Sequence, residues 1–187
     1  MTTPIPAVRL NHAVLFVTDL ERAVTFWTTA FGMEVAAREP RANAAFLRLT
    51  RSGNHHDLGL FGLGAGAAPK RPGTVGLYHL AWQVDTIDEL EAARTTLAEL
   101  GAYTGESSHG ATKSIYGADP DGNDFEVMWM LPREDWGVHE NAAPVERLNL
   151  SGEVERWSGV GTSATVATGP VRERAGHLRG AHRRHAR

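Results

Sequence analysis

The sequence of 187 residues contains no cysteine. Disulfides, iron–sulfur clusters, thiolate zinc sites and a cysteine nucleophile are therefore excluded, and metal chemistry is left to histidine, carboxylate and tyrosine side chains. The chain also lacks a large excess of one charge, because its formal net charge is −3. We therefore expect neither nucleic acid nor an anionic membrane as a partner.

Long apolar runs are absent too. No segment approaches the roughly 20 apolar residues of a membrane-spanning helix, and the first residues do not combine a basic segment with an apolar run. The expected location is the cytoplasm. What the sequence does contain is a globular composition, with 42% hydrophobic and 22% charged residues, which is enough for one well-packed domain.

The first part of the chain alternates strand and helix patterns. Residues 8–17 are apolar and branched, which predicts a mostly buried strand with His12 inside it. Thr18 and Glu21 have the spacing of a capping box, so a helix should follow and end at Gly32. Shorter strand patterns follow at residues 35–37, 45–49 and 58–63.

The same pattern then starts again. Residues 64–76 are rich in glycine, alanine and proline, which predicts a linker. Residues 77–84 predict a strand that contains His79, and Thr86 begins a second capping box for a helix that should end at Gly101.

A constant spacing relates the two halves. His79 follows His12 by 67 positions, and Glu126 follows Gly59 by the same number. This spacing also aligns Tyr116 with Leu49, so no second tyrosine is expected beside Tyr116. An internal repeat of this size indicates two similar supersecondary units that bury their sheets together.

We therefore predict an α+β fold with two paired β-α-β-β-β modules that form an open mixed-sheet barrel around a metal cleft. The predicted modules are residues 1–63 and 77–131. Residues 132–157 are expected to form a C-terminal extension. The remaining segment, 158–187, is small-residue-rich and then rich in arginine and histidine, which predicts a flexible tail.

A turn organises the second half. The Asp-Pro-Asp-Gly-Asn sequence at residues 119–123 has the residue types of a tight turn. A hairpin centred on Asp121 would place Tyr116 and Glu126 opposite each other and on one face. A phenol and a carboxylate would then project together.

The repeat also suggests a metal site. Equivalent positions of paired modules converge near a pseudo-two-fold axis, so His12, His79 and Glu126 are candidate ligands, while glycine stands at the fourth position. Two neutral imidazoles and one carboxylate form the facial triad of non-haem Fe(II) proteins, which leaves positions open for substrate and oxygen.

A longer pattern adds a resemblance. After His109 come five residues, an apolar residue, Tyr116, an acid-Pro-x-Gly turn and Glu126. This pattern is similar to the signature of type I extradiol ring-cleaving dioxygenases of the vicinal oxygen chelate superfamily, and the resemblance covers about residues 8–131. One departure is Ser107, where that signature usually has Gly, Asn, Thr, Ile or Val.

A second matching segment lies at residues 54–61, which resembles the part of these enzymes that carries an acid/base histidine. The match implies His56. Regular strand alternation instead places His55 on the face of Gly59, unless the strand begins irregularly. His55 therefore remains the rival of His56.

The resemblance implies an Fe(II) enzyme, with Mn(II) as an alternative metal, that opens a catechol with O2 to a semialdehyde. His56 would act as acid/base, and Tyr116 and His109 would hydrogen-bond the substrate. With two modules where better-known extradiol enzymes have four, the chain resembles a single-domain form, and a homo-oligomer is compatible with it. The competing functions are a fosfomycin-type transferase and a non-enzymatic, bleomycin-type binding protein.

Overall fold

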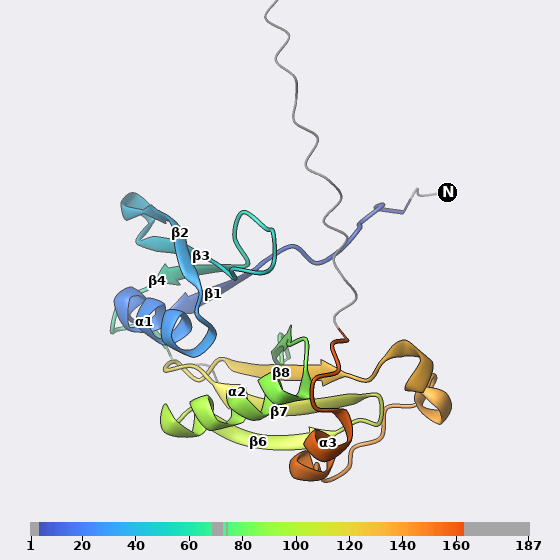
Figure 1. Cartoon of the computed structure of the whole chain (residues 1–187). Helices are drawn as coiled ribbons and strands as arrows, with labels where there is room; N and C mark the ends of the chain where they lie inside the picture. The colour runs from blue at the N-terminus through green and yellow to red at the C-terminus, as the bar shows by residue number, and fades with distance from the viewer. Residues whose placement is uncertain (1–3, 69–72, 74, 163–187) are drawn as a thin grey trace, which may run out of the picture.

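The computed structural model describes residues 4–68, 73 and 75–162. Its strands form two four-stranded mixed sheets (Figure 1). The first sheet has the order β1 (Ala13–Val17), β4 (Leu58–Gly62), β3 (Ala44–Arg48) and β2 (Glu34–Glu39). The second has the order β5 (Leu80–Gln83), β8 (Asp124–Met130), β7 (Thr112–Ala118) and β6 (Tyr103–Ser108). The predicted α+β fold with two β-α-β-β-β modules is confirmed, and the two sheets do not close into one.

The pairing of the strands follows the internal repeat. In the first sheet Val14 lies opposite Gly59, and in the second Ala81 lies opposite Glu126, so these strand pairs keep the spacing of 67. The third strand does not keep it. Tyr116 on β7 pairs with Glu126 on β8. In the first module the residue that pairs with Gly59 is Phe46, not Leu49.

The reason for this difference is loop length. The connection between β3 and β4 is longer than the turn between β7 and β8, so one fixed spacing cannot align every strand. The prediction of Leu49 as the partner of Tyr116 was therefore wrong. The cross-strand pairing of Tyr116 with Glu126 is confirmed.

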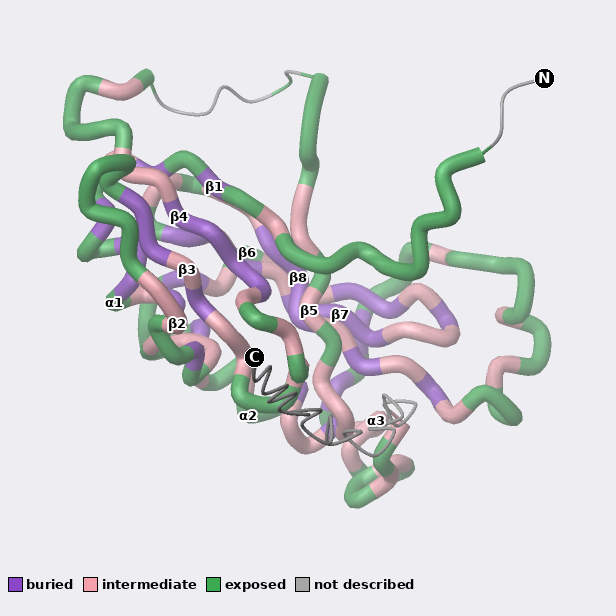
Figure 2. The backbone as a smooth tube through the Cα atoms, turned by 90° about the horizontal axis from the view of Figure 1, so that it is seen from above, coloured by how far each residue is buried: buried purple, intermediate pink, exposed green. Residues whose placement is uncertain are grey.

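The first strand of each module is shorter than predicted. β1 begins at Ala13 and β5 at Leu80, so His12 and His79 each lie just before a strand. In the first module the parallel partner of β1 begins only at Leu58. Residues before Ala13 therefore lack a ladder partner, and residues 4–12 are exposed (Figure 2).

Three α-helices accompany the sheets in the described ranges: α1 (Leu20–Phe31), α2 (Ile87–Glu99) and α3 (Leu150–Trp157). The predicted capping box of Thr86 is confirmed. The one predicted at Thr18 was wrong, because the side chain of Asp19 accepts the hydrogen bond from the Arg22 amide. Gly32 ends α1 with a positive φ of 62°, a conformation that glycine adopts without steric cost.

The helices cover one face of each sheet. Leu15 and Val17 point to the core under α1 and are buried, whereas Val14 and Phe16 on the opposite face are 50% and 66% exposed. We call this opposite face of either sheet the helix-free face. Because side chains alternate along a strand, the apolar residues of β1 lie in turn in the core and on the helix-free face.

An aromatic cluster joins the two modules. The ring of Trp27 on α1 lies 5.9 Å from the ring of Trp82 on β5 and 5.2 Å from that of Phe125 on β8. Trp27 and Phe125 are almost fully buried. The first helix therefore packs against the second sheet as well as its own, and this contact fixes how the modules meet.

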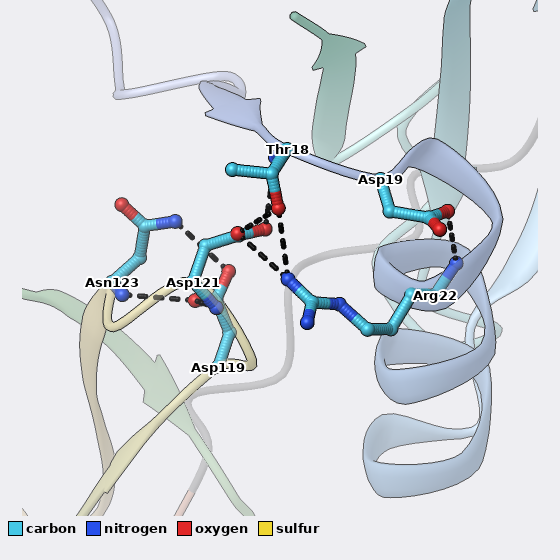
Figure 3. A network of polar contacts seen from close by, with 6 residues as sticks. All are labelled: Thr18, Asp19, Arg22, Asp119, Asp121 and Asn123. Carbon is cyan, nitrogen blue, oxygen red and sulfur yellow. Dashed lines mark hydrogen bonds and ion pairs between the residues drawn. The ribbon is translucent and has the colours of Figure 1, made fainter. Parts of the chain in front are cut away.

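A network of polar contacts at the predicted turn also joins the two modules (Figure 3). Asp121, between β7 and β8, accepts hydrogen bonds from the Thr18 amide at 3.2 Å and from the Thr18 hydroxyl at 2.5 Å. It also forms an ion pair with Arg22 at 2.8 Å. Thr18 therefore binds the second module instead of capping its own helix.

The C-terminal extension packs on the second module. It contains two three-residue 3-10 helices, at Arg133–Asp135 and Gly137–His139. The first module has one such helix, at Pro40–Ala42. Lys113 on β7 pairs with Glu153 on α3 at 3.0 Å. Beyond α3, Thr162 hydrogen-bonds to Asp85, and the rest of the predicted tail lies outside the described residues. Within the described ranges, none of the helices combines the length and apolar character of a membrane span.

Candidate metal and substrate site

The candidate residues of the second module lie on the helix-free face of its sheet. Tyr116 on β7 and Ala81 on β5 both pair with Glu126 on β8, so the three form one cross-strand row. Side chains in such a row point the same way. The neighbouring row contains Ser107 and Ser114. The strand register thus places polar groups side by side.

His79 and Glu126 are in direct contact. The Nε2 atom of His79 lies 3.0 Å from Oε2 of Glu126. The other carboxylate oxygen, Oε1, accepts a hydrogen bond from the hydroxyl of Ser114. Ser114 is fully buried and Glu126 is 9% exposed, so the carboxylate is held in a fixed orientation.

This geometry fits a metal ion. Nitrogen and oxygen ligands at adjacent corners of an octahedron, each about 2.1 Å from the ion, lie about 3 Å apart. The 3.0 Å separation of the two donor atoms is that of an ordinary hydrogen bond, and it would also allow both atoms to bind one ion. The Ser114 hydroxyl would serve as the outer hydrogen bond that orients a ligating carboxylate. Nδ1 of His79 is buried without a hydrogen-bond partner among the described residues.

A second polar group lies beside this pair. The hydroxyl of Tyr116 lies 2.8 Å from Nε2 of His109, and the rings of Tyr116 and His79 are 6.0 Å apart. The other ring nitrogen of His109 contacts the carbonyl oxygen of Pro144 at 2.8 Å. The C-terminal extension therefore supports a side chain of the site.

His12 and His56 belong to the first module, where they lie just before β1 and β4. Their rings are 4.5 Å apart, and the ring of His56 is 5.1 Å from that of Phe46. Phe46 occupies the position that Tyr116 has in the second module. The helix-free face of the first sheet is thus apolar, with two imidazoles at its end.

The structure also distinguishes His55 from His56. β4 begins at Leu58, so both histidines lie in the irregular segment before the strand and strand alternation does not apply to them. His56 is half-buried beside His12, whereas His55 is exposed. Burial lowers the pKa of His56, and the neighbouring His12 and His55 lower it further. A lowered pKa favours the neutral imidazole, which can accept a proton.

The three predicted metal ligands are not all brought together within one chain. His79 and Glu126 meet, while His12 lies with His56. No cluster of three His, Asp or Glu side chains suited to a metal ion is found in the part of the chain that the structure describes.

A small pocket of about 170 Å³ lies beside His79. It is lined by Tyr78, His79, Thr104, Tyr116, Gly117, Asp124 and Phe125. Pockets for small molecules usually measure about 300–1,000 Å³. The pocket is therefore smaller than a typical small-molecule site, and Glu126 is not among its lining residues.

Sequence reasoning missed three contributors: Ser114, the Ser107 hydroxyl and the Pro144 carbonyl. Alternation along β7 could have indicated Ser114, because it is two residues from Tyr116 and shares its face. Ser107 was noted only as a departure from a signature. Nothing local indicated Pro144, because its contact with His109 spans 35 residues.

Comparison with known proteins gives the family. A family model described as the Glyoxalase/Bleomycin resistance protein/Dioxygenase superfamily matches residues 9–127. The chain belongs to this superfamily. Among solved structures, a glyoxalase/dioxygenase from Nostoc punctiforme has a TM-score of 0.57 and 21% identity, and the match covers 70% of this chain and 99% of that one. At this identity the likeness shows the superfamily fold alone.

Two curated relatives are named for ring-cleaving activity. Biphenyl-2,3-diol 1,2-dioxygenase 3 of Rhodococcus globerulus is 35% identical over 122 residues, which are 64% of this chain and 62% of that protein. Catechol-2,3-dioxygenase of Bacillus subtilis (strain 168) is 29% identical over 127 residues, which are 68% of this chain and 43% of that protein. The chain thus matches only part of the length of each relative.

Proposed function

We propose that this protein is an Fe(II)-dependent extradiol dioxygenase that opens a catechol with O2 to a semialdehyde. The observation that carries the proposal is the contact between His79 and Glu126 on the same sheet face as the hydrogen-bonded Tyr116 and His109. The names of the two ring-cleaving relatives support it. Mn(II) is the alternative metal for this ligand set.

Each residue has a role in this proposal. His79, Glu126 and His12 would hold the ion, which supplies an electronic connection between catechol and O2 when bound. Tyr116 would hydrogen-bond a substrate oxygen from the wall of the pocket, with His109 behind it. His56 would accept and return a proton as an acid/base catalyst.

The position of His12 suggests how the site is completed. The described residues of one chain offer a pair of ligands and a partial pocket on the second sheet. They also leave an exposed apolar face with two histidines on the first sheet, where Phe16 is 66% exposed. We therefore propose a homodimer in which the first sheet of one copy covers the second sheet of the other. In a two-fold dimer the arrangement is reciprocal and creates two equal sites.

Metal content tests the proposed ligands. The protein and its His12→Ala, His79→Ala and Glu126→Ala variants would be loaded with Fe(II) under anaerobic conditions. We expect each variant to lose iron and to keep its circular dichroism spectrum, because one of three ligands is removed while the sheets stay packed. Full iron content in all three variants would refute the ligand set.

Complementation tests the shared site. Co-expressed His12→Ala and Glu126→Ala chains form mixed dimers in which one site has lost both ligands and the other is intact. Random pairing makes half of the dimers mixed, so iron content and turnover should recover to about a quarter of the wild-type values. A site built within one chain would show no recovery.

A non-enzymatic small-molecule binding protein is the second candidate. The specific observation in its favour is that the described residues of one chain bring only two of the three proposed ligands together. Such a protein would bind catechols without iron. Catechol binding that is unchanged by complete removal of metal would favour this candidate over the enzyme.

A further inference from the structure

The C-terminal extension lies against the end of the second sheet, where β6 ends and β7 begins (Figure 1). Ser108, the last residue of β6, exchanges two backbone hydrogen bonds of 2.9 Å each with Glu146 of the extension. The extension starts at Pro132, beyond residues 9–127 of the superfamily match. A segment outside the matched domain is therefore paired with the residue directly before His109.

The residue directly after His109 also packs on the extension. Gly110 is buried and has a φ of 75°, a conformation that glycine adopts without steric cost. A Cβ atom at this position would overlap the imidazole of His139 in the 3-10 helix at Gly137–His139. The extension thus contacts both chain neighbours of His109 at close range.

The extension contacts the ring of His109 as well. The carbonyl oxygen of Pro144 is 2.8 Å from Nδ1, and a carbonyl oxygen can only accept a hydrogen bond. In the neutral ring Nδ1 therefore carries the hydrogen, and Nε2 has a lone pair. The opposite form would place two lone pairs against each other at this short distance.

The contacts on the other side of the ring agree with this assignment. Nε2 lies 2.8 Å from the hydroxyl of Tyr116 and 2.8 Å from that of Ser107, and the two hydroxyl groups are 2.9 Å apart. One hydroxyl can donate to Nε2 while the other donates to the first hydroxyl. Hydrogen on Nδ1 therefore satisfies all four contacts at once.

We propose that the C-terminal extension is a positioning element of the site: through the carbonyl of Pro144 it holds the His109 ring with hydrogen on Nδ1 and with the Nε2 lone pair toward Tyr116 and Ser107. The backbone pairing of Glu146 with Ser108 fixes the place of that carbonyl. The inference rests on the proposed function, because it assigns His109 to the site that opens a catechol.

Two substitutions at Glu146 form a matched pair. The Glu146 side chain is exposed, so Glu146→Ala should stay within about twofold of the wild-type kcat/KM for catechol. Glu146→Pro removes the amide hydrogen that Ser108 accepts and should displace Pro144. We expect it to lower kcat/KM of the iron-loaded protein about 10-fold to 100-fold, the effect of a shift of about 1 Å within a site.

Iron content shows whether the proline acts locally. The Glu146→Pro variant should keep its iron, because His79 and Glu126 belong to β8 and the start of β5 and do not contact the extension's Pro144 carbonyl. Loss of iron together with activity would overturn the proposal, since the whole sheet would then be disturbed. Equal kcat/KM in the proline and alanine variants would overturn it too.

A double-mutant cycle shows whether the extension acts through His109. In a His109→Phe background the ring has no Nδ1 for Pro144 to hold. Glu146→Pro and Glu146→Ala should therefore have equal residual kcat/KM in this background. A difference of the original size would contradict the proposed route.

A metal-free measurement separates this inference from the proposed function. Nitrogen-15 NMR of the neutral His109 ring should show hydrogen on Nδ1 in the wild type and in Glu146→Ala, and a mixture of the two ring forms in Glu146→Pro. Hydrogen on Nε2 in the wild type, or one identical spectrum in all three proteins, would overturn the proposal. If the wild type consumes no O2 with catechols, the proposed function fails, while these spectra still decide whether the extension holds the ring.

Discussion

The buried contact between Ser114 and Glu126 gives a quantitative prediction. The Ser114→Ala variant removes the hydroxyl that, among the described residues, donates to Oε1 of Glu126. Both residues are buried, at 0% and 9% exposure, so water cannot easily replace the lost donor. A hydrogen bond to a charged group contributes about 1.5–3 kcal/mol. The free energy of unfolding should therefore fall by about 2 kcal/mol in the metal-free protein.

The same variant should weaken metal binding. A hydrogen bond that orients a ligating carboxylate is typically worth about 10-fold to 100-fold in metal affinity. Urea unfolding followed by circular dichroism measures the free energy of unfolding, and anaerobic titration with Fe(II) measures the metal affinity. Unchanged affinity in Ser114→Ala would refute the assignment of Glu126 as an oriented ligand.

Ser108→Ala is the matched control. Ser108 is also buried, at 7% exposure, but its hydroxyl accepts from Lys113 at 3.0 Å and does not contact the carboxylate. Loss of the Ser108 hydroxyl should lower the free energy of unfolding and leave the metal affinity unchanged. If Ser108→Ala weakened metal binding as much as Ser114→Ala, the effect would reflect general loosening of the sheet.

Further variants test other parts of the structure. His56→Phe should keep iron but lower turnover by about 10²–10⁴-fold, as expected for an acid/base residue, whereas His55→Phe should remain active; the opposite result would assign the role to His55. Asp121→Ala should lower the free energy of unfolding by about 2–3 kcal/mol, measured in urea, because its side chain is mostly buried and satisfies several donors at the start of α1. The amide of Gly159 is the main group that holds the pKa of Asp88 below its ordinary value of 3.8. The contribution of ionised Asp88 to the free energy of unfolding is therefore present above pH 3.8 and is lost as the pH falls through the lowered pKa. The stability difference between wild type and Asp88→Asn should therefore shrink in acid, and a difference that grows there would show that the sign is wrong.

Local patterns predicted much of the fold. The apolar strands, the Thr86 capping box and the turn at residues 119–123 each depend on residues close together in sequence, and the structure contains all of them. The spacing of 67 also relates the paired residues of β1 and β4 to those of β5 and β8. It failed for Phe46, since loops of unequal length shift the third strand.

The candidate site was predictable only within one module. Tyr116 and Glu126 belong to one hairpin, so the turn alone places them together. The position of His12 depends on how the modules meet, and that is decided by the contact of Trp27 with Trp82 and Phe125. The sequence shows the apolar stripe of α1 but not that its aromatic residues pack on the other module.

Product analysis with catechol tests the central claim most directly. Iron-loaded protein and its Glu126→Ala variant would be given catechol, while O2 uptake and the absorbance of the product are followed. We predict one O2 consumed for each ring and a yellow semialdehyde, opened beside the two hydroxyl groups, with both signals lost in the variant. Muconate, formed by cleavage between the hydroxyl groups, or no O2 uptake with any catechol, would contradict the proposed function.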